Sequence, residues 1–401
     1  MQAIFRKNIL CLQIYWRVLV IELVSQENHG DQVTGKMPAG YKTLWDRSSI
    51  FQQKEKEQPF FFWYGGHEPH RTYEEGSGVK AGKILEESAV PAFLPDHELI
   101  KSDVADYALE IEWFDSHLGK MIQYLEEQGE LENTIIVVTA DNGMPFPSAK
   151  ANLQEYGTHV PLAICWPSKM KGNRVVKDLV ALIDLAPTFL ELAKVEKVPE
   201  MTGKSLSKLL IPVPEVQSKT HREFVLTGRE RHTHARPDNL GYPARAIRTQ
   251  DYLYVRNFKP DLWPAGDPEP ITAKNQLPGF KSLSPGFHDV DDSPSKLFLI
   301  EQQSNYPTEY NLAYEKRPSE QLYDIKKDPS CVNNVAEVPF YAEIRKELRT
   351  KLDTEGDPWV LGFGDIFDSY PRMSTMREFE GFHERGEYNP AYIQKGQVKI
   401  E

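Results

Sequence analysis

Apolar runs and one long helical pattern alternate along the first half of the chain. The runs 59–64 (PFFFWY) and 134–139 (TIIVVT) are short, rich in aromatic or β-branched residues, and bounded by turn residues, as buried strands are. Between them, apolar residues recur at helical spacing over 103–128, and charged residues fill the opposite face. A strand, a crossover helix and a second buried strand are typical of a βαβ unit, so we expect parallel strands in a mostly parallel sheet.

The second half of the chain has shorter periodic segments. After a linker marked by Pro212 and Pro214, several strand-like runs and one amphipathic helix favour a small antiparallel sheet packed on the first domain. Residues 260–296 are rich in Pro, Gly, Asp and Ser, and they indicate a long surface loop. The expected strands are 223–227, 244–248, 252–255 and 321–325, and the expected helix is 339–352.

The composition is that of a globular protein with a net negative charge. The 401 residues leave room for two domains, and a hydrophobic content of 40% is enough for sizeable cores. A net charge of −12 argues against nucleic acid as the partner, because phosphate binding favours a basic surface.

The three cysteines, Cys11, Cys165 and Cys331, show neither metal-ligand spacing nor a disulfide framework. The N-terminal apolar segment is broken by Arg17 and is too short and too charged to span a bilayer.

Polar side chains suited to ligand binding follow both buried strands. Asp141-Asn142-Gly143 comes directly after the second strand, Lys150 lies nine residues after Asp141, and His67 follows the first strand. Asp-Asn-Gly alone is a common turn, because Asn and Gly tolerate positive φ. Parallel strands bring their carboxyl ends to one edge of a sheet, where ligands bind, so we expect these side chains to converge on one pocket. Asp and Asn oxygens suit a hard divalent cation such as Ca²⁺ or Mg²⁺.

A series of short motifs runs through most of the chain, between residues 59 and 359. They are GGHEPHR at 65–71, TADNG at 139–143, YGTHVPLAICWP at 156–167, ALIDLAPTFLELAKV at 181–195, MTGKSLSKLL at 201–210 and EQLYDIKKDP at 320–329. In this order and spacing they resemble the sulfatase family, and within it the branch of heparan N-sulfatase and similar glycan sulfatases. The resemblance implies an alkaline-phosphatase-like fold, in which helices sandwich a mostly parallel sheet and a smaller C-terminal subdomain holds an antiparallel sheet.

The resemblance also implies a role for four residues. Asp141 and Asn142 match two of the family's Ca²⁺ ligands, and Lys150 matches the cation that holds the sulfate oxygens. His67 matches the histidine that contacts sulfate and assists proton transfer at the leaving group. Cleavage of a sulfate builds charge on the sulfuryl oxygens and on the departing oxygen or nitrogen, so cations and a general acid suit this reaction. The implied substrate is a sulfated carbohydrate.

Two family signatures are missing before the first predicted strand. Sulfatases carry an Asp-Asp pair and a Cys/Ser-x-Pro-Ser-Arg motif, whose first residue becomes formylglycine, the nucleophile. The 58 residues before the first strand contain neither, and the chain's one Asp-Asp, Asp291-Asp292, lies in the predicted loop. We therefore interpret 1–58 as an atypical or truncated segment, and we expect an incomplete Ca²⁺ ligand set and impaired hydrolysis.

Residues 165–169 (CWPSK) imitate the nucleophile motif, with Lys in place of Arg. They end an apolar run that in the family is a structural strand, and Lys does not reproduce the planar, bidentate fork of Arg. We therefore interpret Cys165 as a buried structural thiol.

The segment 228–236 (GRERHTHAR) is the densest cluster of His and Arg in the second half. One interpretation is a solvated loop, because charge runs are usually exposed. The other is a substrate rim, because Arg and His suit sulfate and carboxylate groups. For this second interpretation we select His232 and Arg245 as candidate substrate-binding residues.

These patterns divide the chain into four predicted segments: the atypical start 1–58, a catalytic domain 59–215, a C-terminal α+β subdomain 216–370 and an irregular tail 371–401. Two alternatives to a sulfate hydrolase stay open. One is a phosphodiesterase or phosphatase of the same superfamily, which would need more Asp and His metal ligands, and the other is a non-catalytic remnant. Intact relatives are expected in the periplasm, outside the cell or in the lysosome, and no clear signal peptide is visible here.

Overall fold

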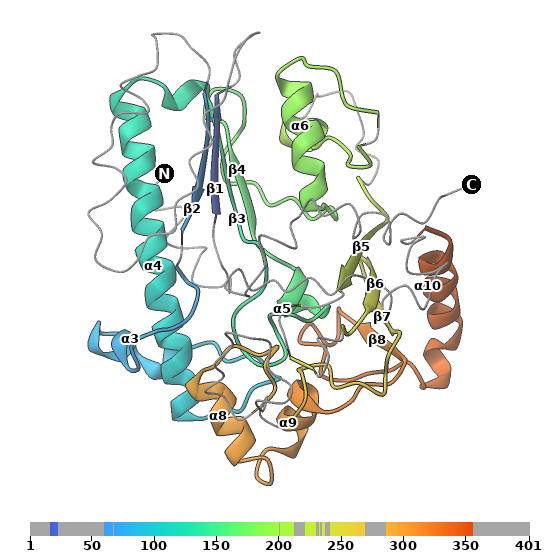
Figure 1. Ribbon diagram of the computed structural model, residues 1–401. Coiled ribbons are helices and arrows are strands. Elements are labelled where there is room, and N and C mark those ends of the chain that lie inside the picture. Colours follow the sequence, from blue (N-terminus) through green and yellow to red (C-terminus); the bar gives the residue numbers. More distant parts are fainter. Residues whose placement is uncertain are drawn as a thin grey trace, which may run out of the picture. The chain divides into compact units, whose positions relative to one another are not determined.

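The chain forms two compact units whose segments alternate along the sequence in this computed structural model (Figure 1). Unit 1 comprises Met1–Lys83, Ala105–Asn142 and Val160–Val225, and unit 2 comprises Ile84–Val104, Gly143–His159 and Leu226–Glu401. The residues that the structure describes are 17–22, 60–66, 68–199, 201–211, 221–229, 232, 235–236, 241–268 and 286–355. The predicted domain boundaries after residues 58, 215 and 370 stay a prediction.

Unit 1 is built on a four-stranded sheet with the strand order β2-β1-β3-β4. The strands are β1 (Arg17–Glu22), β2 (Phe61–Gly65), β3 (Thr134–Thr139) and β4 (Leu162–Cys165). β1 pairs antiparallel with both β2 and β3, so β2 and β3 run in the same direction, as a βαβ unit requires. β4 pairs antiparallel with β3. The expectation of a mostly parallel sheet is therefore wrong for the described strands, because the neighbours in this sheet are all antiparallel.

The difference is due to β1, which the hydrophobic pattern did not predict. Its sequence, RVLVIE, lies inside the segment interpreted as an atypical start. In the sheet it separates the two predicted strands, with Val20 opposite Phe62 on one side and Ile136 on the other. A strand inserted between two parallel neighbours can run against both and still pair its backbone on both edges.

Helices lie on both sides of this sheet in unit 1 (Figure 1). The predicted helix over 103–128 is confirmed as α4 (Glu98–Glu127), whose first residues belong to unit 2. On one side, the rings of Tyr64 in β2 and Phe114 in α4 lie 5.9 Å apart. On the other side, α6 (Leu185–Leu192) packs against the buried residues Ile135 and Val137 of β3. Each fully buried aliphatic side chain of this kind contributes about 1.5–3 kcal/mol.

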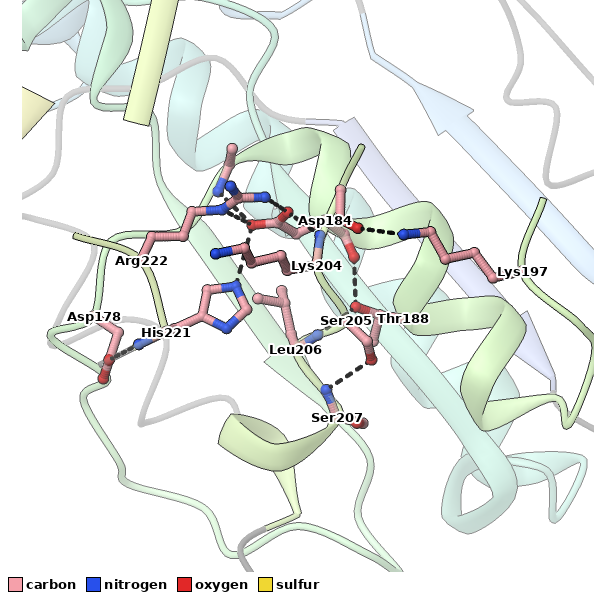
Figure 2. Close-up of polar contacts among 12 residues, drawn as sticks. Asp178, Asp184, Thr188, Lys197, Lys204, Ser205, Leu206, Ser207, His221 and Arg222 are labelled. Carbon is pink, nitrogen blue, oxygen red and sulfur yellow. Dashed lines mark hydrogen bonds and ion pairs between the residues drawn. The ribbon is translucent and has the colours of Figure 1, made fainter. Parts of the chain in front are cut away.

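A buried carboxylate ties the loop before α6 to two later segments of unit 1 (Figure 2). The side chain of Asp184 is fully buried and accepts hydrogen bonds from the backbone N–H groups of Ala181 and Lys204, at 3.0 and 2.7 Å. Arg222 donates to both of its oxygens, with its Nε at 2.9 Å, and His221 Nε2 lies 3.3 Å away. The aspartate of the motif ALIDLAPT is therefore a structural residue, which joins three loops.

Unit 2 contains the predicted small antiparallel sheet, with the order β5-β6-β7-β8. Its strands are β5 (Phe224–Arg229), β6 (Ala244–Thr249), β7 (Tyr252–Asn257) and β8 (Glu320–Asp324). β7 pairs antiparallel with β6 and β8. The predicted final helix is also confirmed: α10 (Ala342–Glu355) follows a 3₁₀ turn at Pro339–Tyr341 and packs against β6 and β7.

The prediction of a surface loop over 260–296 is wrong for residues 286–296, the last part of this range that the structure describes. Asp289 and Lys296 are 1% and 0% exposed, and α8 (Pro294–Glu301) begins within the predicted loop. Ser293 caps this helix by accepting a hydrogen bond from the Lys296 N–H, and Pro294 occupies the first turn, which favours a helix start. The polar composition indicated exposure, but these charged side chains are buried in ion pairs such as Lys296 with Asp292, at 2.9 Å.

Shorter elements complete the described part of the chain. They are α3 (Ser77–Lys80), α5 (Glu155–Thr158), α7 (Ser207–Leu210), α9 (Pro307–Tyr314) and the 3₁₀ turns Leu85–Glu87, Leu131–Asn133 and Leu182–Asp184. Among the described helices, none has both the length and the apolar composition that crossing a bilayer would require.

Asp184→Ala should lower the free energy of unfolding by about 3–5 kcal/mol, because it leaves the Arg222 guanidinium without its carboxylate in a buried site. Urea denaturation followed by circular dichroism measures this change. Glu74→Ala is the control in the same unit: it removes an exposed ion pair with Lys80 and should leave the midpoint nearly unchanged. Equal, small effects of the two substitutions would contradict the structural role of Asp184.

Candidate active site

The residues that follow β3 include one buried side-chain oxygen, that of Asn142, that accepts no hydrogen bond from the described residues. Asp141 is exposed and Asn142 is half-buried. The Oδ1 atom of Asn142 is itself buried, and within the described residues it accepts no hydrogen bond. A buried amide oxygen without a partner is costly, so a ligand or a water molecule is expected there. An amide oxygen beside a carboxylate is a donor set that fits Ca²⁺, although the described residues supply only these two ligands at this point.

Gly143 is required here by a close approach of two backbones and not by a turn with positive φ. A Cβ atom at this position would lie 1.8 Å from the carbonyl oxygen of Tyr156. The Gly143 N–H donates to the carbonyl of Gly157 at 3.1 Å, and Gly143 does not adopt a positive φ. The glycine of Asp-Asn-Gly therefore fixes the path of the chain as it enters the segment that carries Lys150.

Lys150 lies in a tightly folded and buried part of unit 2. Its backbone N–H donates to the carbonyl of Met144 at 3.0 Å. The nearby residues Ser148 and Ala151 have φ values of 65° and 63°, a left-handed conformation that non-glycine residues adopt only when their surroundings impose it. The side chain of Lys150 is 8% exposed. Backbone contacts thus hold this lysine at a defined position.

The ammonium group of Lys150 is paired with Asp291. The Nζ and Oδ2 atoms lie 2.8 Å apart, and the carboxylate is 18% exposed, more than the lysine is. A buried ammonium needs such a partner, because an uncompensated buried charge costs several kcal/mol. Asp291 therefore supplies a negative charge beside the Lys150 ammonium inside unit 2.

His232 lies close to the same group of charges. Its Nδ1 atom is 3.9 Å from Oδ1 of Asp289. Burial first, and then the positive charge of Lys150, lowers the pKa of His232, against the opposing charges of Asp289 and Asp291. Lys150 and His232 were predicted separately from the sequence, and the structure brings them near enough for one charge to act on the other. His232 is therefore neutral at pH 7.

Arg245 makes contacts with the backbone of the sheet in unit 2. Its Nη1 atom donates to the carbonyls of Arg229 at 3.2 Å and of Ala244 at 2.8 Å. The side chain packs on Gly228, where a Cβ atom would lie 2.9 Å from Cδ of Arg245. These contacts join β5 to β6, and a role of Arg245 in substrate binding stays a prediction.

The sequence analysis expects four residues to lie in one pocket: His67, Asp141, Asn142 and Lys150. This expectation also stays a prediction. His67 lies outside the described residues. Asp141 and Asn142 belong to unit 1 and Lys150 to unit 2, and each unit is described by itself. Over the described segments, no cluster of three or more His, Cys, Asp or Glu side chains is arranged to hold a metal ion.

Cys165 lies in β4 and is half-buried, and burial raises the pKa of its thiol. A raised pKa disfavours the thiolate, which is the reactive form. This supports the interpretation of Cys165 as a structural thiol.

The sequence analysis did not identify three carboxylates that pair with the basic residues of unit 2. Asp289, Asp291 and Asp292 each lie within 3 Å of a buried cation of unit 2. One signal in the sequence could have found them: 289–292 (DVDD) is the densest acidic group in the second half, and the basic segment 228–236 needs counter-charges if it is buried.

Two family models match the chain over overlapping regions. One, described as Sulfatase, matches residues 31–195. The other, described as N-sulphoglucosamine sulphohydrolase, C-terminal, matches residues 149–267. Together they extend over more than half of the chain, and the second covers both Lys150 and His232.

Individual relatives agree with these models. The chain is 28% identical over 353 residues to an N-sulphoglucosamine sulphohydrolase of Homo sapiens, covering 77% of this chain and 64% of that protein. It is 27% identical over 276 residues to an ulvan-active sulfatase of Formosa agariphila, covering 69% of this chain and 41% of that protein. A solved structure reported with the metabolism of multiple glycosaminoglycans by Bacteroides thetaiotaomicron has a TM-score of 0.52 at 17% identity, covering 80% of this chain and 59% of that one.

The chain therefore spans less than two thirds of the length of these relatives. The family models, the named relatives and the shared fold all agree with the motifs from GGHEPHR to EQLYDIKKDP. The chain belongs to the sulfatase family.

Proposed function

We propose that the chain hydrolyses sulfate groups on carbohydrate, either sulfate esters or N-sulfates, with the assistance of a metal ion. The observation that carries the proposal is the buried ammonium of Lys150, held by Asp291 and close enough to His232 to lower its pKa. Both Lys150 and His232 lie in the region matched by the N-sulphoglucosamine sulphohydrolase model. A buried cation suits a reaction that needs a positive charge beside an anionic substrate.

Lys150 would stabilise the sulfuryl oxygens as negative charge builds on them. The loop contacts of Lys150 and its pairing with Asp291 keep the ammonium at a fixed position, so little reorganisation is needed when sulfate arrives. A sulfate oxygen would take the place of the Asp291 carboxylate, which is the more exposed of the two partners. Asp291 would thus act as a stand-in for the substrate anion.

His232 would contribute as a neutral imidazole. Because burial and Lys150 lower its pKa, it has both a donor and an acceptor nitrogen at pH 7 and can bind a sugar hydroxyl or a sulfate oxygen. Arg245 would support this region indirectly, through its contacts with the backbone of β5 and β6.

Ca²⁺ is the metal ion that the oxygen donors after β3 favour. Asp141 and Asn142 would hold it, and the unpartnered Oδ1 of Asn142 is the atom that supports this assignment. When bound, the ion would supply positive charge to the sulfuryl oxygens. His67 would donate a proton to the departing oxygen or nitrogen.

The reaction also needs a nucleophile, which in the family comes from a specific sequence motif. The sequence contains no Cys/Ser-x-Pro-Ser-Arg motif, and its closest imitation, 165–169, has Lys in place of Arg. We therefore propose that this polypeptide turns over sulfated sugars slowly. A non-catalytic protein that only binds sulfated carbohydrate is the alternative, and a phosphatase has less support because the matched models and named relatives are sulfatases.

Lys150→Ala should lower the rate of sulfate release from N-sulfoglucosamine by about 10²–10³-fold, because it removes a fixed charge from the transition state. Ion chromatography of released sulfate measures the rate, and titration calorimetry with the same sugar measures binding if the rate is too low to detect. Lys326→Ala is the matched control: this exposed lysine pairs with Asp251 and should leave both quantities unchanged.

Cys165→Ala should also leave sulfate release unchanged. Release and binding that survive Lys150→Ala would contradict the role of Lys150, and release that disappears with Cys165→Ala would identify Cys165 as the nucleophile instead.

Ca²⁺ should bind this polypeptide weakly, with a Kd of about 10⁻⁴ M or higher, because two recognisable oxygen ligands are far fewer than the six to eight of a full site. Isothermal titration calorimetry measures the affinity, and Asp141→Ala should abolish the remaining heat. Asp261→Ala, at an exposed position, is the control. Tight, stoichiometric binding that depends on Asp141 would show that other residues complete the ligand set.

A further inference from the structure

Three buried side chains of unit 2 leave polar hydrogens without an acceptor. Arg229 ends β5, Arg236 lies in the following segment, and Tyr242 lies just before β6. Their side chains are almost fully buried: the two arginines are 8% and 0% exposed, and Tyr242 is 1% exposed. Arg229 and Arg236 belong to the basic segment 228–236, and Tyr242 follows it. Of this segment, the proposed reaction uses only His232.

The two guanidinium groups share a single carboxylate. Nη2 of Arg229 and Nη2 of Arg236 lie 2.6 and 2.7 Å from the same oxygen, Oδ2 of Asp289. Within the described residues, no other carboxylate contacts either group. Two buried positive charges therefore face one negative charge, and the charge of Arg317 adds to the excess at both Arg229 and Tyr242.

Burial and the neighbouring charges lower the pKa of Arg229. Burial first, then the charges of Arg236 and Arg317, lowers its pKa to about 10, although Asp289 opposes the shift. A buried group of cations with too few anions is stabilised by a further anion.

The two guanidinium groups lie near one aromatic ring, that of Tyr242. The guanidinium carbons of Arg229 and Arg236 lie 5.8 and 5.6 Å from the centre of the Tyr242 ring. In the part of the chain that the structure describes, Nε of Arg229, Nη1 of Arg236 and the hydroxyl of Tyr242 are buried and have no hydrogen-bond partner. Three donors with no acceptor, next to an excess of positive charge, are the complement of an oxyanion.

We propose that Arg229, Arg236 and Tyr242 bind a small inorganic oxyanion such as sulfate. The near-complete burial of Tyr242 and Arg236 favours a free ion over a sulfate attached to a sugar. The three residues of this site are not among those assigned to hydrolysis, and Lys150 pairs with Asp291. It would neutralise the buried arginines and so stabilise unit 2.

Tyr242→Phe tests the site with little change to the fold. The substitution removes a hydroxyl that makes no hydrogen bond among the described residues and keeps the ring that the two guanidinium groups face. Sulfate is titrated into the full chain in a low-chloride buffer, and the melting temperature and heat of binding are recorded. Every measurement is made in a Lys150→Met background, so that sulfate binding at the proposed catalytic lysine does not contribute.

We expect sulfate to raise the melting temperature of the parent chain, and we expect Tyr242→Phe to weaken sulfate binding about tenfold, as the loss of a hydrogen bond to a charged group does. Tyr323→Phe is the matched control, because its hydroxyl already accepts a hydrogen bond from Gln321 and sulfate affinity should not change. Arg229→Lys keeps the charge but loses Nε, and it should also weaken binding about tenfold.

Three results would overturn the proposal, and the first two concern free sulfate. One is the absence of any sulfate effect in the Lys150→Met chain, and the other is an equal effect with and without the Tyr242 hydroxyl. N-sulfoglucosamine serves as the probe for a sugar-bound sulfate in the same background, and binding of this sugar without binding of free sulfate would also overturn it.

Discussion

A positive charge can be buried only when a negative charge lies close by, and in unit 2 one short acidic segment meets much of this requirement. Residues 289–292 supply three carboxylates, and each lies within 3 Å of a basic side chain. The cations are Lys150, Arg229, Arg236 and Lys296. Burial lowers the pKa of Lys296, whereas Arg236 and Arg229 keep the pKa of Asp289 below its usual value despite burial. The segment therefore allows basic residues to be buried where sequence composition alone indicated a surface loop.

This arrangement also shapes the chemistry that we propose. A lysine that binds sulfate must be held at a defined position when no substrate is present, and the ion pair with Asp291 contributes to this for Lys150. The same arrangement has a cost, because an anionic substrate must compete with the carboxylate that holds the lysine. Affinity for sulfate would then depend on how readily Asp291 gives up its contact, and the neutral state of His232 keeps a further positive charge out of the cluster.

The sequence predicted those elements whose periodicity is strong and local. The strands around 61–65 and 134–139, the helix over 98–127 and the antiparallel strands of unit 2 all follow from hydrophobic spacing. The sequence did not predict β1, because a six-residue apolar run has no signal for its partners or its direction. Likewise, the pairing of Lys150 with Asp291 joins residues far apart in the sequence, and only tertiary structure decides whether an acidic loop residue faces solvent or a buried cation. For the candidate site, residue types could be predicted, but their counter-charges could not.

The central claim is that the carboxylates of 289–292 are what allow the cations of unit 2 to be buried. A double-mutant cycle on Asp289 and Arg236, with Asp289→Leu, Arg236→Met and the double variant compared by their free energies of unfolding, tests it most directly. Asp289→Leu leaves two buried guanidinium groups without their carboxylate, and Arg236→Met removes one of these two charges. The coupling should therefore be at least about 2 kcal/mol, and the double variant should be more stable than the sum of the single effects suggests. Effects that add to within about 0.5 kcal/mol would contradict the claim, because they would show that the two groups do not stabilise one another.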